Sequence, residues 1–201
     1  MDWFVLNQRR LWGDLGRVLI GGFFKRFGNG PMLLERTGPF VPPFFVPWGP
    51  LFSRPVVSDT FKTTLASSGF DELKFRRAIK WKIVRKPWHE WDLAADNPQE
   101  MPNNEPSDYV WGRIPNLLTA LQMERCWELI LPVSQMEYQS VDPDDEDSPN
   151  EAVMKKGFEY PRWFYTRKEY GDIVVSPPVR DWLQSTIPEW VQFEPLRYTI
   201  A

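Results

Sequence analysis

The spacing of apolar residues predicts a strand–helix–strand unit over residues 56–78, and the same pattern recurs over residues 174–196. Each segment opens on a short β-branched run. A stripe of apolar residues at helical spacing follows, typical of a helix with one buried face. Each segment then ends on alternating apolar and polar positions, which indicate a strand with one buried face. The pattern therefore predicts two similar structural units in one chain.

The two segments align without a gap when one is shifted by 118 residues, and six of the 23 aligned positions are identical. The identical residues are Val56, Val57, Ser58, Leu65, Ser67 and Phe75, opposite Val174, Val175, Ser176, Leu183, Ser185 and Phe193. We interpret this match as an internal duplication. The alternative is that two ordinary strand–helix–strand stretches have converged on one pattern.

Both predicted helices carry signals at their ends. Ser58 and Ser176 stand where a hydroxyl can accept a hydrogen bond from the first free N–H groups of a helix, so we expect both to be N-caps. Pro177 suits the first helical position, because its missing N–H would have no partner there. Gly69 tolerates a positive φ and is expected to end the first helix.

The predicted fold class is α+β, with short helices covering a mixed or mainly antiparallel sheet in a single domain over residues 1–201. Pattern alone leaves open whether the two units share a sheet. A further helix is expected after Pro115, with Leu117, Leu118 and Leu121 on one face. Residues 11–53 are rich in Gly, Pro and Phe and are expected to wrap the core, and residues 140–151 are expected to form an acidic loop.

Composition favours short elements joined by ordered connections. The chain has 20 prolines and 11 tryptophans among 201 residues, which does not suit a helical bundle. Its single cysteine, Cys126, excludes an internal disulfide and a Cys-rich metal site, and fits a reducing compartment. No stretch has the pattern of a secretory signal or a membrane helix, so we expect a cytoplasmic protein.

Charge is distributed unevenly along the chain. Residues 54–86 hold nine Lys or Arg against three acidic residues, whereas residues 89–151 hold two Arg against 15 acidic residues. An asymmetry of this kind marks either a surface that faces a partner or a solvated face. The basic stretch could follow a phosphate backbone, but charges that protect a strand edge from aggregation explain it more simply, and we do not expect a nucleic-acid partner.

Candidate catalytic chemistry is sparse. The one histidine, His89, lies beside Glu90 and Asp92 and could act as a general base, although its position between two tryptophans also fits a structural role. Cys126 precedes an apolar run, which favours a buried, inert thiol. The acidic pairs of residues 140–151 do not have the spacing of a known calcium loop. We therefore predict no catalytic residue, no metal and no cofactor.

Three segments together resemble a known family. They are the opening Trp3-Phe4-Val5-Leu6, the first repeat unit from Pro55 through Phe75, and the second unit from Ile173 through Pro195. In these segments the chain resembles the immunity proteins of bacterial polymorphic toxin systems, in particular the "immunity protein eleven" family, common in myxobacteria. The resemblance covers about a third of the chain, and the shared positions build the scaffold, so no toxin-contact residue can be carried over.

The resemblance implies a cytoplasmic, non-enzymatic protein that binds and neutralises a cognate toxin. Tight protein interfaces use buried aromatic anchors with charge around them, so we expect the acidic, Trp-containing part of the chain to form the interface. The candidate interface residues are Trp88, His89, Glu90, Trp91, Asp92, Asp142, Asp144, Asp145, Glu146 and Asp147. Two other functions stay open: a ligand- or peptide-binding module with a groove lined by Trp88, Trp91 and Trp111, and an enzyme that uses carboxylates and His89.

Overall fold

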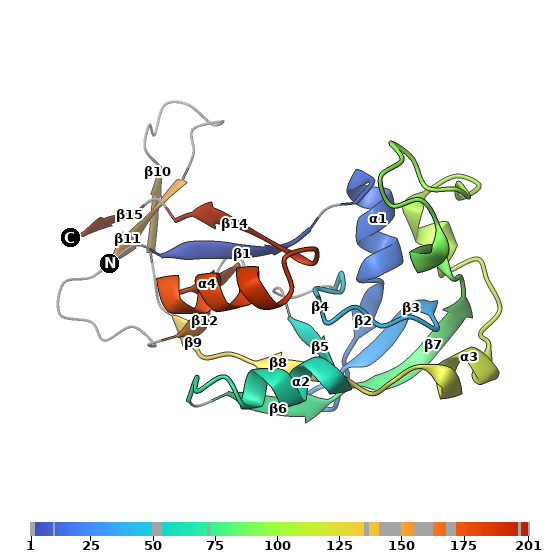
Figure 1. Ribbon diagram of the computed structural model, residues 1–201, viewed down its shortest axis with the longest axis horizontal. Coiled ribbons are helices and arrows are strands. Elements are labelled where there is room, and N and C mark those ends of the chain that lie inside the picture. Colours follow the sequence, from blue (N-terminus) through green and yellow to red (C-terminus); the bar gives the residue numbers. More distant parts are fainter. Residues whose placement is uncertain are drawn as a thin grey trace. The chain divides into compact units, whose positions relative to one another are not determined.

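A few short helices are interspersed among runs of short strands, which confirms the α+β prediction (Figure 1). The computed structural model describes residues 3–9, 11–49, 54–71, 73–134, 137–140, 150–154, 163–167, 172–196 and 198–200. Contacts divide the chain into two compact units: unit 1 combines residues 1–7 with residues 131–201, and unit 2 comprises residues 8–130. The single domain over residues 1–201 stays a prediction.

Unit 1 contains two sheets. Its elements are β1 (Phe4–Gln8), β9 (Val133–Ser134), β10 (Glu137–Ser140), β11 (Asn150–Met154), β12 (Phe164–Arg167), β13 (Ile173–Val175), α4 (Pro177–Thr186), β14 (Val191–Pro195) and β15 (Tyr198–Ile200). One sheet has the order β14-β1-β13-β12-β9, and the other has the order β10-β11-β15. Antiparallel and parallel neighbours occur in both sheets, so both are mixed.

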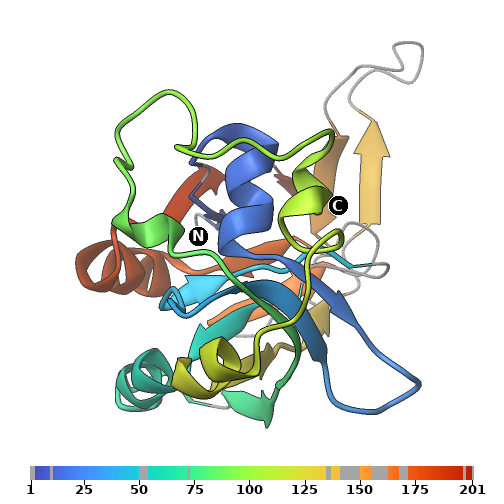
Figure 2. The ribbon, with the colours of Figure 1, turned by 90° about the vertical axis from the view of Figure 1, so that its right-hand side faces the viewer.

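Unit 2 also contains two sheets. Its elements are α1 (Gly13–Ile20), β2 (Phe23–Lys25), β3 (Leu33–Gly38), β4 (Phe44–Phe45), β5 (Val56–Ser58), α2 (Asp59–Ala66), β6 (Lys74–Arg77), β7 (Ile79–Arg85), η1 (Trp88–Glu90), η2 (Pro106–Tyr109), α3 (Leu117–Gln122) and β8 (Cys126–Ile130), where η marks a 3₁₀ turn. The sheets have the orders β2-β3-β7 and β4-β5-β8-β6. The long connection after β7 passes around α1 (Figure 2), where the indole N–H of Trp12 donates to the carbonyl of Ala95 at 2.8 Å.

The two repeated segments have the same local topology. In unit 2, the strands β5 and β6 lie on either side of β8, and in unit 1 the strands β13 and β14 lie on either side of β1. Each pair of strands is joined through a helix, α2 or α4 (Figure 1). The copies therefore belong to different sheets, which answers the question that the sequence pattern left open.

An aligned pair of cations strengthens the case for duplication. The ammonium group of Lys62 lies 3.7 Å from the ring centroid of Trp127, and the guanidinium carbon of Arg180 lies 4.2 Å from that of Phe4. Lys62 and Arg180 are aligned by the 118-residue shift. The two rings also correspond, because Trp127 pairs with Val57 and Phe4 pairs with the aligned Val175. In each copy, therefore, a cation on the helix contacts an aromatic ring on the middle strand of the three. An internal duplication predicts such a match.

The two serine caps differ. The Ser58 hydroxyl accepts from the backbone N–H of Phe61 at 3.1 Å and so caps α2 as the sequence predicts. Ser176 also occupies an N-cap position, with extended backbone, but its hydroxyl is buried and makes no hydrogen bond within the described part of the chain. Pro178 follows at the second helical position and supplies no N–H, which removes one of the two donors that an N-cap serine uses.

The prediction that residues 11–53 wrap the core stays a prediction, and the described part of that segment forms regular elements. It contains α1, β2, β3 and β4, and all six residues of β3 are buried. Three of these buried residues are polar, and each has at least one local partner. Glu35 pairs with Lys25 at 2.8 Å, Arg36 donates to the carbonyl of Ile20 at 3.0 Å, and Thr37 donates to the carbonyl of Leu19 at 2.7 Å. The polar residues of β3 thus belong to a strand that lies between two others in its sheet.

The stability of unit 1 is expected to depend on the protonation of Asp172. Burial raises the pKa of its carboxyl from 3.8 to about 6, and Glu194 acts in the same direction. The native state therefore binds a proton between pH 6 and pH 4 that the unfolded chain does not bind. It follows that the free energy of unfolding falls as the pH rises from about 4 to about 6.

Replacing Asp172 with Asn should remove this slope. The shift corresponds to at most about 3 kcal/mol, and we expect about 1 kcal/mol because water screens a group that is only partly buried. Urea denaturation of the wild type and of Asp172→Asn at pH 4, 5, 6 and 7 measures the difference. Parallel pH profiles would show that Asp172 titrates normally in the native state.

Candidate functional site

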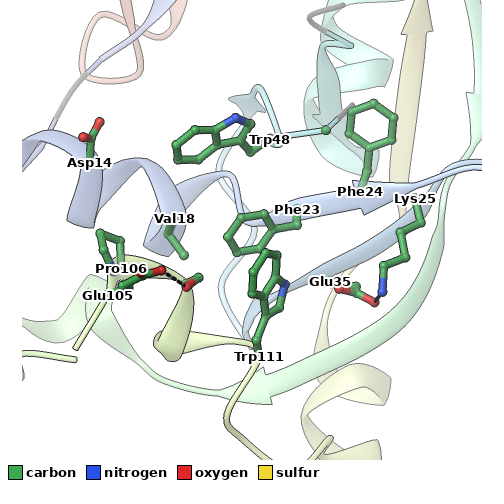
Figure 3. Close-up of a pocket in the computed structure, with 12 residues that line it drawn as sticks. Asp14, Val18, Phe23, Phe24, Lys25, Glu35, Trp48, Glu105, Pro106 and Trp111 are labelled. Atoms are coloured by element: carbon green, nitrogen blue, oxygen red, sulfur yellow. Dashed lines mark hydrogen bonds and ion pairs between the residues drawn. The ribbon is translucent and has the colours of Figure 1, made fainter. Parts of the chain in front are cut away.

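A pocket lined by aromatic side chains is the candidate binding site, and it lies entirely within unit 2 (Figure 3). Its volume is about 650 Å³, within the range of small-molecule sites. The lining residues come from α1, β2, β3, the segment after β4, and η2 with its flanks: Asp14, Val18, Phe23, Phe24, Lys25, Glu35, Trp48, Gly49, Glu105, Pro106, Ser107 and Trp111.

Three aromatic rings form a row in this pocket. Phe23 stands between the other two: its ring centroid is 6.3 Å from that of Trp48, with an interplanar angle of 12°, and 4.6 Å from that of Trp111, with an angle of 34°. Both tryptophans reach the surface, since Trp48 is 43% exposed and Trp111 is 55% exposed. A ligand in the pocket would therefore meet ring surfaces that water covers in the free protein.

Backbone hydrogen bonds position the segment that carries Trp48. The N–H of Trp48 donates to the carbonyl of Gly22 at 2.8 Å, and the N–H of Phe24 donates to the carbonyl of Trp48 at 2.8 Å, so the segment that carries Trp48 runs beside β2. Gly49 is required in this arrangement, because a Cβ atom there would lie 2.0 Å from the Phe24 ring. The pocket wall is thus tied to the sheet by main-chain contacts.

Trp111 is held by η2. Glu105 and Asp108 form a reciprocal capping box at the start of this turn, and the N–H of Trp111 donates to the carbonyl of Ser107 at 2.9 Å. The Trp111 carbonyl also accepts from the Lys82 ammonium at 2.9 Å. These contacts fix the wall of the pocket that Trp111 forms.

Charged groups lie on both sides of the aromatic row (Figure 3). On one side, Lys25 and the buried Glu35 form an ion pair of 2.8 Å. On the other side, Asp14 projects from the first turn of α1 and Glu105 from the start of η2. The carboxylate of Glu105 accepts from the Ser107 hydroxyl at 3.4 Å as well as from the capping box.

Residues 111–121 form a second exposed feature, which we call the apolar stretch. Its large apolar side chains are strongly exposed: Trp111 55%, Ile114 87%, Leu117 73%, Leu118 72% and Leu121 71%. The helix predicted after Pro115 is present as α3, and the leucines that the pattern places on one face of it are exposed. The side chain that α3 buries is Thr119, which is 2% exposed. Aliphatic surface that stays in water contributes nothing to the stability of the free protein, and exposed surfaces of this kind are typical of interaction sites.

The predicted interface residues Trp88 and Trp91 belong to the core. Trp88 is 0% exposed, and its indole N–H donates to the Thr37 hydroxyl at 3.1 Å. Trp91 is 9% exposed and packs on Trp12 with ring centroids 6.0 Å apart. Neither indole can anchor a partner, because the fold already covers it. The predicted groove of Trp88, Trp91 and Trp111 is therefore wrong, although Trp111 does line a pocket.

The other predicted interface residues are only partly described. Glu90 and Asp92 are exposed, and the His89 ring stacks on Phe40 with centroids 4.7 Å apart. Its Nε2 atom lies 3.8 Å from a carboxylate oxygen of Glu90, a contact that is an ion pair only when the imidazole is protonated. Asp142, Asp144, Asp145, Glu146 and Asp147 lie outside the described residues, as does most of the predicted acidic loop over residues 140–151.

Cys126 is buried, and burial raises the pKa of its thiol. This suits a packed, unreactive thiol rather than a nucleophile. Within the ranges that the structure describes, no three His, Cys, Asp or Glu side chains are grouped so that they could hold a metal ion.

The chain matches no known protein family, no curated protein and no solved structure in the comparisons made with each of them. No described helix is both long enough and apolar enough to cross a membrane.

The pocket was missed by sequence reasoning. Phe23 and Trp48 fall in the segment that was expected to wrap the core, and they lie 25 residues apart. The density of aromatic residues in this segment was the available signal. Nothing in the pattern, however, places Trp48 beside β2 or Trp111 beside Phe23.

Proposed function

We propose that this protein is an immunity protein that binds a cognate antibacterial toxin in the cytoplasm and neutralises it by contact, without catalysis. The sequence resemblance in the opening strand and the two repeat units motivates this proposal. The observation that carries it is the apolar stretch, in which five large side chains within 11 residues face water. Surfaces of this kind mark protein interfaces.

The position of this surface suits a binding role. The Asn116 side chain accepts from the N–H of Thr119 at 2.8 Å and caps α3, and the N–H of Asn116 donates to the carbonyl of Ile83 in β7 at 2.7 Å. The leucines thus stand on a helix that is anchored to a sheet. A partner would meet a preformed surface and would have little ordering entropy to overcome.

The experiment replaces Leu117, Leu118 and Leu121 together with Gln and measures binding to the toxin encoded beside this protein's gene. We expect at least a ten-fold rise in Kd, because truncated hot-spot side chains each cost about 2 kcal/mol or more. Protection of cells that express the toxin should fall with binding. The thermal midpoint should stay within a few degrees, because these side chains are exposed.

A matched control replaces the exposed residues Thr63 and Thr64 of α2 with Gln, and should leave binding unchanged. Wild-type affinity in the triple-leucine variant would remove the apolar stretch from the interface. A neighbouring gene that encodes no toxin, together with no protection of toxin-expressing cells, would contradict the immunity function itself.

A second function, as a module that binds a small ligand or a peptide, is favoured by one observation, the aromatic pocket. This second function is compatible with the first. Trp111 belongs both to the pocket and to the apolar stretch, so the two surfaces are adjacent.

A further inference from the structure

The aromatic pocket has the chemistry of a cation site. The faces of Trp and Phe rings carry negative charge density and attract ammonium and guanidinium groups. The structure already shows this attraction at one wall, because the guanidinium carbon of Arg17 lies 4.6 Å from the ring centroid of Trp48. Arg17 does not line the pocket, and the rings of Phe23 and Trp111 do.

The charges that line the pocket are unbalanced on one side. Lys25 and Glu35 neutralise each other at 2.8 Å. Asp14 and Glu105 remain across the aromatic row from that pair (Figure 3), and neither makes an ion pair within the described part of unit 2. Glu105 accepts its hydrogen bonds from neutral donors, the Asp108 N–H and the Ser107 hydroxyl, so its charge is not compensated. A cation in the pocket would be attracted by the charge of these carboxylates and by the ring faces.

We propose that this pocket binds an organic cation, whose ammonium or guanidinium group is attracted by the Asp14 and Glu105 carboxylates while its apolar body contacts Phe23 and Trp111. The cation belongs either to a free small molecule or to a basic side chain of a protein partner. The inference does not depend on the immunity function, because the pocket exists whichever partner covers the apolar stretch.

Two matched pairs of compounds test the proposal. The first pair is choline and 3,3-dimethylbutan-1-ol, in which carbon replaces the charged nitrogen at nearly constant shape. The second pair is N-acetyl-arginine methylamide and the corresponding citrulline derivative. Titrations followed by calorimetry and by the NMR signals of the Trp48 and Trp111 indole N–H groups should show a Kd at least ten times lower for the cation of at least one pair.

The pair that shows this preference identifies the source. A preference for choline indicates a free small molecule, whereas a preference for the arginine derivative indicates a side chain of a protein. Equal binding of charged and neutral compounds in both pairs, or no shift of either indole signal at millimolar concentrations, would overturn the proposal.

Two variants separate charge in the pocket from charge elsewhere. Replacing Asp14 with Asn and Glu105 with Gln keeps the size of both side chains, and should reduce the preference for the cation to less than two-fold. The control Glu90→Gln removes one exposed carboxylate that does not line the pocket, and should preserve the preference. A preference that survives in the double variant contradicts the assigned role of these carboxylates, provided that its thermal midpoint shows a folded protein.

Discussion

Replacing Trp88 with Ala is expected to lower the free energy of unfolding by about 4 kcal/mol. The indole is 0% exposed, and its ring packs edge-on against Phe40 with centroids 5.5 Å apart. Its removal leaves a cavity and deprives the Thr37 hydroxyl of the indole N–H that donates to it. Chemical denaturation of the purified variant measures the loss.

The matched control is the same substitution at Trp81, a residue of β7 that is 61% exposed. We expect Trp81→Ala to cost less than about 1 kcal/mol, because most of the ring is already in water. Similar losses at both positions would contradict the assignment of Trp88 to the core. Preserved stability of Trp88→Ala with loss of partner binding would restore the original interface prediction.

Replacing Glu128 with Gln is expected to cost about 3 kcal/mol, because it removes the one negative charge on which three arginines converge. The Glu128 side chain is 1% exposed, and its oxygens lie 2.5 Å from Arg26, 3.7 Å from Arg54 and 3.9 Å from Arg76. Gln keeps the shape of the side chain but leaves these cations to repel one another. Arg26, whose side chain is 17% exposed, loses the most.

The control for this prediction is Arg76→Gln. The Arg76 side chain is 39% exposed and its ion pair is the longest of the three, so we expect a loss below about 1 kcal/mol. The effect of Glu128→Gln should persist at high ionic strength, because salt screens buried pairs weakly. Equal losses for the two variants would show that Glu128 behaves as a surface carboxylate.

Sequence reasoning succeeded where structure depends on neighbours along the chain. Val56 and Val57 are followed by a capping serine and by Phe61 and Leu65 at helical spacing, and this local order produces β5 and α2. Gly69 has the expected positive φ of 82° after the helix. The α+β class and the paired strand–helix–strand units follow from the same short-range rules.

Sequence reasoning is insufficient where burial depends on what packs from elsewhere. The leucines of α3 fit a helical pattern. In the structure, however, the buried side chain of this helix is Thr119, and Leu117, Leu118 and Leu121 are exposed to water. In β3, Glu35 and Arg36 are charged and still buried, because Lys25 and the carbonyl of Ile20 lie close enough to pair with them. The spacing of residues along the chain does not indicate which distant groups will pack against them.

Local residue order was thus sufficient for the secondary structure of the repeat units, because caps, turns and periodic stripes act over a few residues. The aromatic pocket required the whole of unit 2, since Asp14, Phe23, Trp48 and Trp111 come from four separate segments. They meet because main-chain hydrogen bonds place the Trp48 segment beside β2, and because η2 packs against α1. Long-range packing of this kind also determines which tryptophans are buried and which remain available to a ligand.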